Sequence, residues 1–147
     1  MKKGILFGLA VSAMMLFNAS VFAAGEHKIV LQLSDADVAK QNLVLNVAGN
    51  LQKHYGLADS QIEVVAFGPG LKLLIDNPKD KAEMKVGNRV NGLAANNIRF
   101  SACGNTLNKM TKKLGHKPKL NKNSVVVEAG AARIADLVSQ GYILLRP

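Results

Sequence analysis

The chain contains one cysteine, Cys103, and its setting could support chemistry. A lone thiol cannot form a disulfide within its own chain, so it is an inert core residue, a link to another chain or a reactive group. An apolar run of strand character ends at Cys103, and a helical pattern begins just after it. The unpaired N–H groups and the positive dipole end of such a helix favour a thiolate, which would make Cys103 nucleophilic. The competing interpretation is a small buried hydrophobic residue, because free cysteines are often buried.

Residues that could bind a substrate or partner surround this cysteine. Gly104 would leave room for a ligand to reach the sulfur, Gly104 and Asn105 offer backbone N–H groups, and Thr106 offers a hydroxyl. A tight turn after another predicted strand could border the same pocket, and it consists of Gly68, Pro69 and Gly70. This segment lacks the lysine-serine pair and the spacing of a phosphate-binding loop, so we interpret it as a simple turn that does not bind phosphate.

A group of lysines follows the cysteine: Lys109, Lys112, Lys113, Lys117, Lys119 and Lys122. Helical spacing places the first three away from the core, and a charge run of this kind is most often a solvated face. The functional alternative is a basic rim, with Lys109 and Lys113 nearest the site, that attracts anionic small molecules or an acidic partner.

The histidines give little support for a metal site or for a catalytic pair of a histidine with Cys103. Their spacing fits no zinc site, and nothing places them beside Cys103. If a leader were cleaved after Ala24, the new terminus Gly25-Glu26-His27 could hold Cu(II) in a square plane. Apart from that alternative, we predict no metal site and no cofactor.

The first residues have the organisation of a cleavable export signal. Lys2 and Lys3 precede an apolar run over residues 4–17, and residues 21–23 provide a cleavage site. The run is short for a membrane span, although an uncleaved anchor is the alternative. We therefore expect removal of residues 1–23, a single periplasmic domain over residues 24–147, and no membrane span after cleavage.

The chain is basic, with 19 Lys and Arg residues against 10 Asp and Glu residues and a net charge of +9. An exported protein rarely meets nucleic acid, and no aromatic residues alternate with the lysines as stacking on single strands requires. We therefore predict no nucleic-acid partner. An anionic membrane surface, anionic small molecules or an acidic protein fit the charge better.

Strand and helix patterns alternate along the remaining chain. The predicted strands span residues 28–33, 61–67, 98–102, 124–128 and 142–145, and the predicted helices span 35–55, 78–96, 106–114 and 130–140. Residues 71–75 are expected to form a short strand or a helical turn. This alternation, with continuously apolar strands, predicts an α/β fold with a parallel sheet covered on both faces. Sites in such sheets form at the carboxyl ends of strands, where Cys103 falls.

Three segments resemble the DsrE/DsrF-like family of sulfur-handling proteins: KIVLQLSDAD at 28–37, IEVVAFGPGLKLLI at 62–75 and FSACGNTL at 100–107. The likeness spans about residues 28–147. It implies a three-layer α/β/α fold with a mainly parallel five-stranded sheet, and assembly into trimers or hexamers. In sulfur-relay members the matching cysteine carries sulfur as a persulfide, which implies that role for Cys103. Relay members work in the cytoplasm and have an Arg-Gly pair downstream that this sequence lacks.

Two functions of different classes remain. The first is a periplasmic sulfur-handling protein with Cys103 as a persulfide carrier or redox-active thiol, exchanging sulfur with a donor or acceptor protein or with anionic sulfur species. The second is a non-catalytic, oligomeric binding or assembly module with a buried, inert Cys103. Accessibility of the thiol separates the two.

Overall fold

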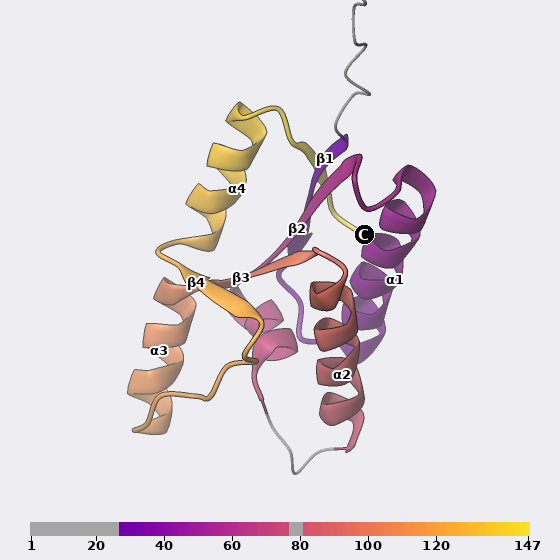
Figure 1. Ribbon diagram of the computed structural model, residues 1–147. Helices are drawn as coiled ribbons and strands as arrows, with labels where there is room; N and C mark the ends of the chain where they lie inside the picture. Colours follow the sequence, from indigo (N-terminus) through magenta and orange to yellow (C-terminus); the bar gives the residue numbers. More distant parts are fainter. Residues whose placement is uncertain (1–26, 77–80) are drawn as a thin grey trace, which may run out of the picture.

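A computed structural model describes residues 27–76 and 81–147 of the chain. The predicted export signal at residues 1–23 lies outside the described residues, as does most of the candidate copper sequence at 25–27. The described chain forms one five-stranded sheet, parallel throughout, with helices on its two faces (Figure 1). The α/β class and the five-stranded parallel sheet expected from the sequence are thus confirmed.

The elements follow the predicted alternation with small shifts at their ends. The strands are β1 (His27–Leu33), β2 (Ser60–Ala66), β3 (Arg99–Cys103), β4 (Ser124–Val127) and β5 (Ile143–Leu145). The helices are α1 (Val38–Tyr55), the 3-10 helix η1 (Gly68–Leu74), α2 (Lys81–Ala95), α3 (Gly104–Leu114) and α4 (Gly130–Ser139). Residues 71–75 thus belong mostly to a helical turn, the second of the two expected alternatives. The predicted start of the second helix, at residue 78, lies outside the described residues.

The strand order is β4-β3-β2-β1-β5, which puts the cysteine-bearing β3 next to an edge. Three successive connections move the chain from β1 toward β4, and the connection through α4 returns it to the opposite edge beside β1. Right-handed crossovers then require α4 to lie on the face opposite the earlier helices. Figure 1 shows this arrangement, with α4 on one side of the sheet and α1 and α2 on the other.

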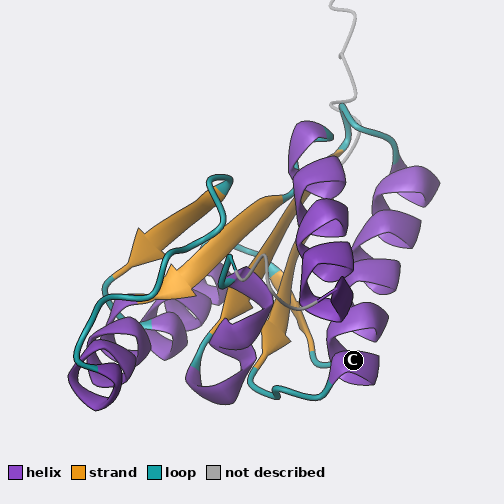
Figure 2. Cartoon of the chain, turned by 90° about the horizontal axis from the view of Figure 1, so that it is seen from below, coloured by secondary structure: helices purple, strands orange, loops and turns teal. Residues whose placement is uncertain are grey.

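Side-chain alternation along the strands divides the core in two. Leu31 and Val64 belong to the larger apolar cluster, which α1, α2 and η1 complete, and Leu107 of α3 joins it. Val30 and Val65 point the other way and pack with residues of α4. Because successive side chains of a strand face opposite sides, a sheet covered on both faces needs apolar residues at consecutive positions. Figure 2 shows the strands running between these two layers of helices.

Two features of the backbone position the carboxyl end of the sheet. No loop separates β3 from α3, since Cys103 ends the strand and Gly104 begins the helix. Gly70 lets η1 approach the end of β1, because a Cβ added there would lie 2.3 Å from the carbonyl oxygen of Leu33. None of the helices within the described residues is long and apolar enough to cross a membrane.

Candidate functional site

Cys103 occupies the strand-to-helix junction that the sequence predicts. It is the last residue of β3 and the N-cap of α3, with an extended backbone at φ −68° and ψ 116°. The residue is 5% exposed, so in this conformation solvent has little access to the thiol. The junction therefore has the geometry expected of a reactive cysteine and the burial expected of an inert one.

A second helix begins beside the cysteine, which the sequence did not indicate. A Cβ added to Gly130, the first residue of α4, would lie 3.2 Å from the Cβ of Cys103 and 2.8 Å from that of Phe67. The N–H of Asn105 also donates to the carbonyl of Glu128 at 3.1 Å, which joins the start of α3 to the segment before α4. Two helix N-termini, each a source of positive potential, thus converge on one sulfur.

Competing effects act on the pKa of Cys103. Burial is the largest single effect and raises the pKa, since it disfavours the charged thiolate. The hydroxyl of Thr106 and the backbone N–H groups of Gly130, Thr106 and Asn105 together outweigh burial and hold the pKa below its ordinary value. Asn105 contributes least of these, and its N–H is also donated to Glu128. The net effect is a larger thiolate fraction than an isolated cysteine would have.

Thr106 connects the cysteine to the turn after β2. Its hydroxyl oxygen accepts a hydrogen bond from the N–H of Gly68 at 2.9 Å, which leaves the hydroxyl proton available for the sulfur of Cys103. Gly68 has a φ of +54°, a left-handed conformation that glycine adopts without strain. The turn and the start of α3 are therefore held together by one threonine that also touches the thiol.

A surface groove of about 800 Å³ lies between η1 and α3. Most of the residues predicted to bind a substrate or partner line it, namely Gly68, Pro69, Asn105, Thr106, Lys109 and Lys113. Lys72, Ile75, Met110 and Leu114 complete the lining. Cys103 is not among the lining residues, and Thr106 separates it from the groove.

The two remaining predicted residues lie elsewhere. Gly104 is buried, and a Cβ added there would lie 3.0 Å from the carbonyl oxygen of Val127, so its small size serves packing against β4. Gly70 is buried against the end of β1, as described above. Neither of these glycines opens a path from solvent to the sulfur.

The basic cluster does not act as one surface. Lys109 and Lys113 line the groove, whereas Lys112, on the same helix, is exposed but outside the lining. Lys119 forms an ion pair with Asp76 at 2.7 Å, across the antiparallel bridge between Ile75 and Leu120. The helical spacing therefore selects two of these lysines for the groove and directs their neighbour away.

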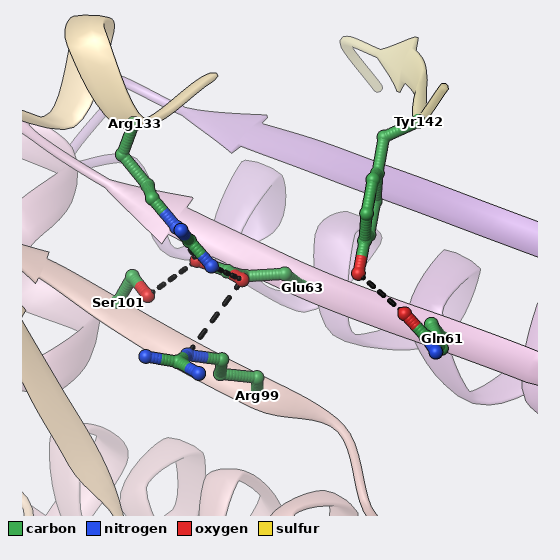
Figure 3. A network of polar contacts seen from close by, with 6 residues as sticks. All are labelled: Gln61, Glu63, Arg99, Ser101, Arg133 and Tyr142. Atoms are coloured by element: carbon green, nitrogen blue, oxygen red, sulfur yellow. Dashed lines mark hydrogen bonds and ion pairs between the residues drawn. The ribbon is translucent and has the colours of Figure 1, made fainter. Parts of the chain in front are cut away.

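A buried ionic network lies on the α4 face of the sheet (Figure 3). The side chain of Glu63 is 3% exposed and accepts hydrogen bonds from Arg133 Nε at 2.8 Å and Nη2 at 2.7 Å. Ser101 donates to the same carboxylate at 2.6 Å, and Arg99 lies 3.6 Å from it. Burial acts to raise the pKa of Glu63, but the bonds from Arg133 and Ser101 outweigh it and lower the pKa.

This network fixes α4 to β2 and β3, and Tyr142 adds a bond to Gln61 at 2.7 Å on the same face. Sequence reasoning missed it. The available signal was a carboxylate, Glu63, inside an apolar strand, which requires a buried cationic partner. The partner, Arg133, lies 70 residues further along the chain, so local patterns could not identify it.

No group of three or more His, Cys, Asp or Glu residues in the described chain is arranged to hold a metal ion. His27 stacks on the ring of Tyr55 with a centroid separation of 3.8 Å, and His54 meets the same ring edge-on at 4.8 Å. His54 lies in the last turn of α1 and His27 at the start of β1, and both pack against Tyr55 at the end of α1.

The fold is similar to that of proteins with solved structures. A protein of unknown function from Methanobacterium thermoautotrophicum, MTH1491, is 25% identical, with a TM-score of 0.69 over 82% of this chain and 99% of that one. The YchN protein of E. coli is 14% identical, with a TM-score of 0.63 and the same coverage of each chain. Both are DsrE-like proteins. No protein-family model and no curated protein matches the sequence.

Proposed function

We propose that this chain is an exported, DsrE/DsrF-like sulfur-handling protein in which Cys103 carries sulfur as a persulfide. The observation that carries the proposal is the position of this thiol, at the N-termini of both α3 and α4, with a lowered pKa. Two further observations support it. The DsrE-like fold is shared with the structural neighbours, and three segments of the sequence resemble the family.

The transfer balances without an external oxidant. The Cys103 thiolate attacks the outer sulfur of a protonated donor persulfide, R–S–SH, so that a new S–S bond forms at Cys103 as the donor S–S bond breaks. The products are Cys103–S–SH, which keeps the proton of the outer sulfur, and the donor thiolate R–S⁻. The reverse attack by an acceptor thiolate on the outer sulfur returns Cys103 to its starting state. The amides of Thr106 and Gly130 and the Thr106 hydroxyl stabilise the negative charge on Cys103 before the attack.

Burial of the thiol supports the alternative function. Because Cys103 is 5% exposed, a donor can reach the sulfur only after a local movement. The adjacent turn at Gly68 and Pro69, which lines the groove beside Thr106 and bonds to its hydroxyl, is the segment whose displacement would expose the sulfur. If no such movement occurs, the protein is a binding or assembly module in which Cys103 is a core residue.

Alkylation of the native protein decides between these functions. We expect iodoacetamide to modify Cys103 with a pH midpoint below that of a free cysteine, and polysulfide to add the mass of one sulfur atom. Cys103→Ser, which lacks the thiol, is the control for sulfur addition elsewhere. Modification that occurs only in denaturant would reject the carrier function and leave the binding module.

Export and assembly are part of the proposal. The basic and apolar leader supports secretion to the periplasm, and the intact mass of the exported protein should lack residues 1–23. Assembly into a trimer or hexamer is supported by the edge strand β4, where Val125 is 46% and Val126 is 50% exposed. Exposed apolar edges of this kind pair readily with other chains. Light scattering that gives the mass of a single chain would contradict this assembly.

A further inference from the structure

We propose that the groove between η1 and α3 binds a small organic anion with an apolar body, such as an alkyl sulfonate or carboxylate. If Cys103 carries sulfur, this class describes the organic part of its donor or acceptor, and to that extent the inference rests on the proposed function. Binding itself needs only the groove.

Four of the residues that line the groove are apolar. Pro69 and Ile75 contribute from the side of η1, and Met110 and Leu114 contribute from α3. Leu114 is 50% exposed, although leucine at the end of an amphipathic helix would normally turn toward the core. An apolar ligand body lying along α3 would cover this side chain and remove apolar surface from water.

The charged residues of the lining are all cationic. Lys109 and Lys113 lie four residues apart on α3, so they are neighbours on one side of the helix and both reach the groove. Lys72 lines the opposite wall. None of the described residues that line the groove is acidic, and the nearby Asp76 is engaged by Lys119. A site with this charge attracts anions and repels cations of the same shape.

The size of the groove argues for an organic ligand. A volume of about 800 Å³ lies within the range that holds ligands of tens of atoms, roughly 300–1,000 Å³. Thiosulfate or sulfide would occupy a small part of the groove and leave its apolar lining residues hydrated. Asn105 and Thr106 line the groove and also interact with Cys103, so an anionic ligand head or a sulfur atom beside Thr106 would be separated from the thiol by that side chain.

The test uses binding of alkane-1-sulfonates below their micelle concentration to the whole exported protein, measured by calorimetry and by amide chemical shifts. We expect affinity to rise by roughly two- to fourfold for each added methylene between hexane- and decanesulfonate. The largest shifts should lie in η1 and α3. Octyl glucoside, octyltrimethylammonium and thiosulfate should each bind more weakly than octanesulfonate.

Two variants with a matched control localise the site. Lys109→Gln with Lys113→Gln should weaken octanesulfonate binding by roughly five- to tenfold. The control, Lys112→Gln with Lys117→Gln, removes the same charge from exposed lysines outside the lining and should change affinity less than twofold. Leu114→Gln, at a half-exposed position, should weaken binding about threefold without unfolding the protein.

Several outcomes would overturn the inference. These are equal binding of octyl glucoside and octanesulfonate, equal effects of the two lysine pairs, or binding only to phosphatidylglycerol vesicles, which would indicate a membrane-surface contact. Cys103→Ser separates this inference from the proposed function. Sulfonate binding by that variant supports the groove even if the thiol proves inert, whereas persulfide formation without sulfonate binding rejects the groove alone.

Discussion

Replacement of Arg133 by methionine tests whether the ionic network around Glu63 fixes α4 to the sheet and so stabilises the site. The change removes two charge-assisted hydrogen bonds, at 2.8 and 2.7 Å, and leaves the Glu63 carboxylate buried with Ser101 and a more distant Arg99. Removal of one partner of a buried pair destabilises a protein by about 3–5 kcal/mol. Because Arg133 is 25% exposed and Arg99 still faces the carboxylate, we expect the low end, about 3 kcal/mol at pH 7.

The loss of stability in Arg133→Met should depend on pH. In the wild-type protein the pKa of Glu63 is lowered on folding, so the carboxylate contributes stability above its unfolded-state pKa. That stability is lost as the pH falls through the lower folded-state pKa. In Arg133→Met the largest effect that opposes burial is absent, so we expect the pKa of Glu63 to rise and protonation to relieve the buried charge. The difference in unfolding free energy between the two proteins should therefore shrink from pH 7 to pH 4.

Urea unfolding of both proteins at pH 7, 5.5 and 4 measures this difference. The double variant Glu63→Gln with Arg133→Met carries no buried charge and should recover most of the lost stability at pH 7. Equal stability of Arg133→Met and wild type at pH 7, or a difference independent of pH, would refute the reasoning. A thiol assay on the folded variant adds a functional measurement, because α4 also supplies the Gly130 amide to Cys103.

Thr106→Val should raise the pKa of Cys103 and slow its alkylation at neutral pH, since it removes the hydroxyl that stabilises the thiolate, whereas Thr106→Ser should keep the wild-type profile. Overlapping pH profiles for the valine and serine variants would contradict this role. Gly70→Ala should destabilise the protein by more than about 1 kcal/mol in urea unfolding, because its Cβ would lie 2.3 Å from the Leu33 oxygen. A stability equal to wild type would show that η1 can move away from β1.

The sequence was sufficient for the architecture because the deciding signals are local. Consecutive apolar residues in β1 and β2 identify strands buried on both faces, and helical spacing of apolar residues identifies the helices between them. The ends of elements were predicted less well. The strand-to-helix junction is sharper than expected, with α3 starting at Gly104, which packs closely against β4, and not at Thr106.

The candidate site was only partly predictable because it is assembled across the chain. Patterns near Cys103 indicated a helix beginning close to it and the hydroxyl of Thr106. The residues after the second predicted strand indicated the Gly68 turn, which the Thr106 bond joins to the site. Nothing local indicated that α4 begins beside the thiol. That contact arises because α4, which connects β4 to β5, crosses the face of the sheet opposite the other helices. It therefore depends on the order of the strands and not on the local sequence.

The pairing of β5 with β1 has a consequence for how the chain reaches this fold. Ile29 lies opposite Ile143 and Leu31 opposite Leu145, so β5, which follows the other four strands in the sequence, completes the pairing of β1. Until β5 has been synthesised, one edge of β1 has no partner, and an apolar edge in that state is open to pairing with other chains. A contact between the two ends of the domain also slows folding. Loss of residues 143–147 should therefore leave a protein that aggregates during synthesis, although its thiol junction is untouched.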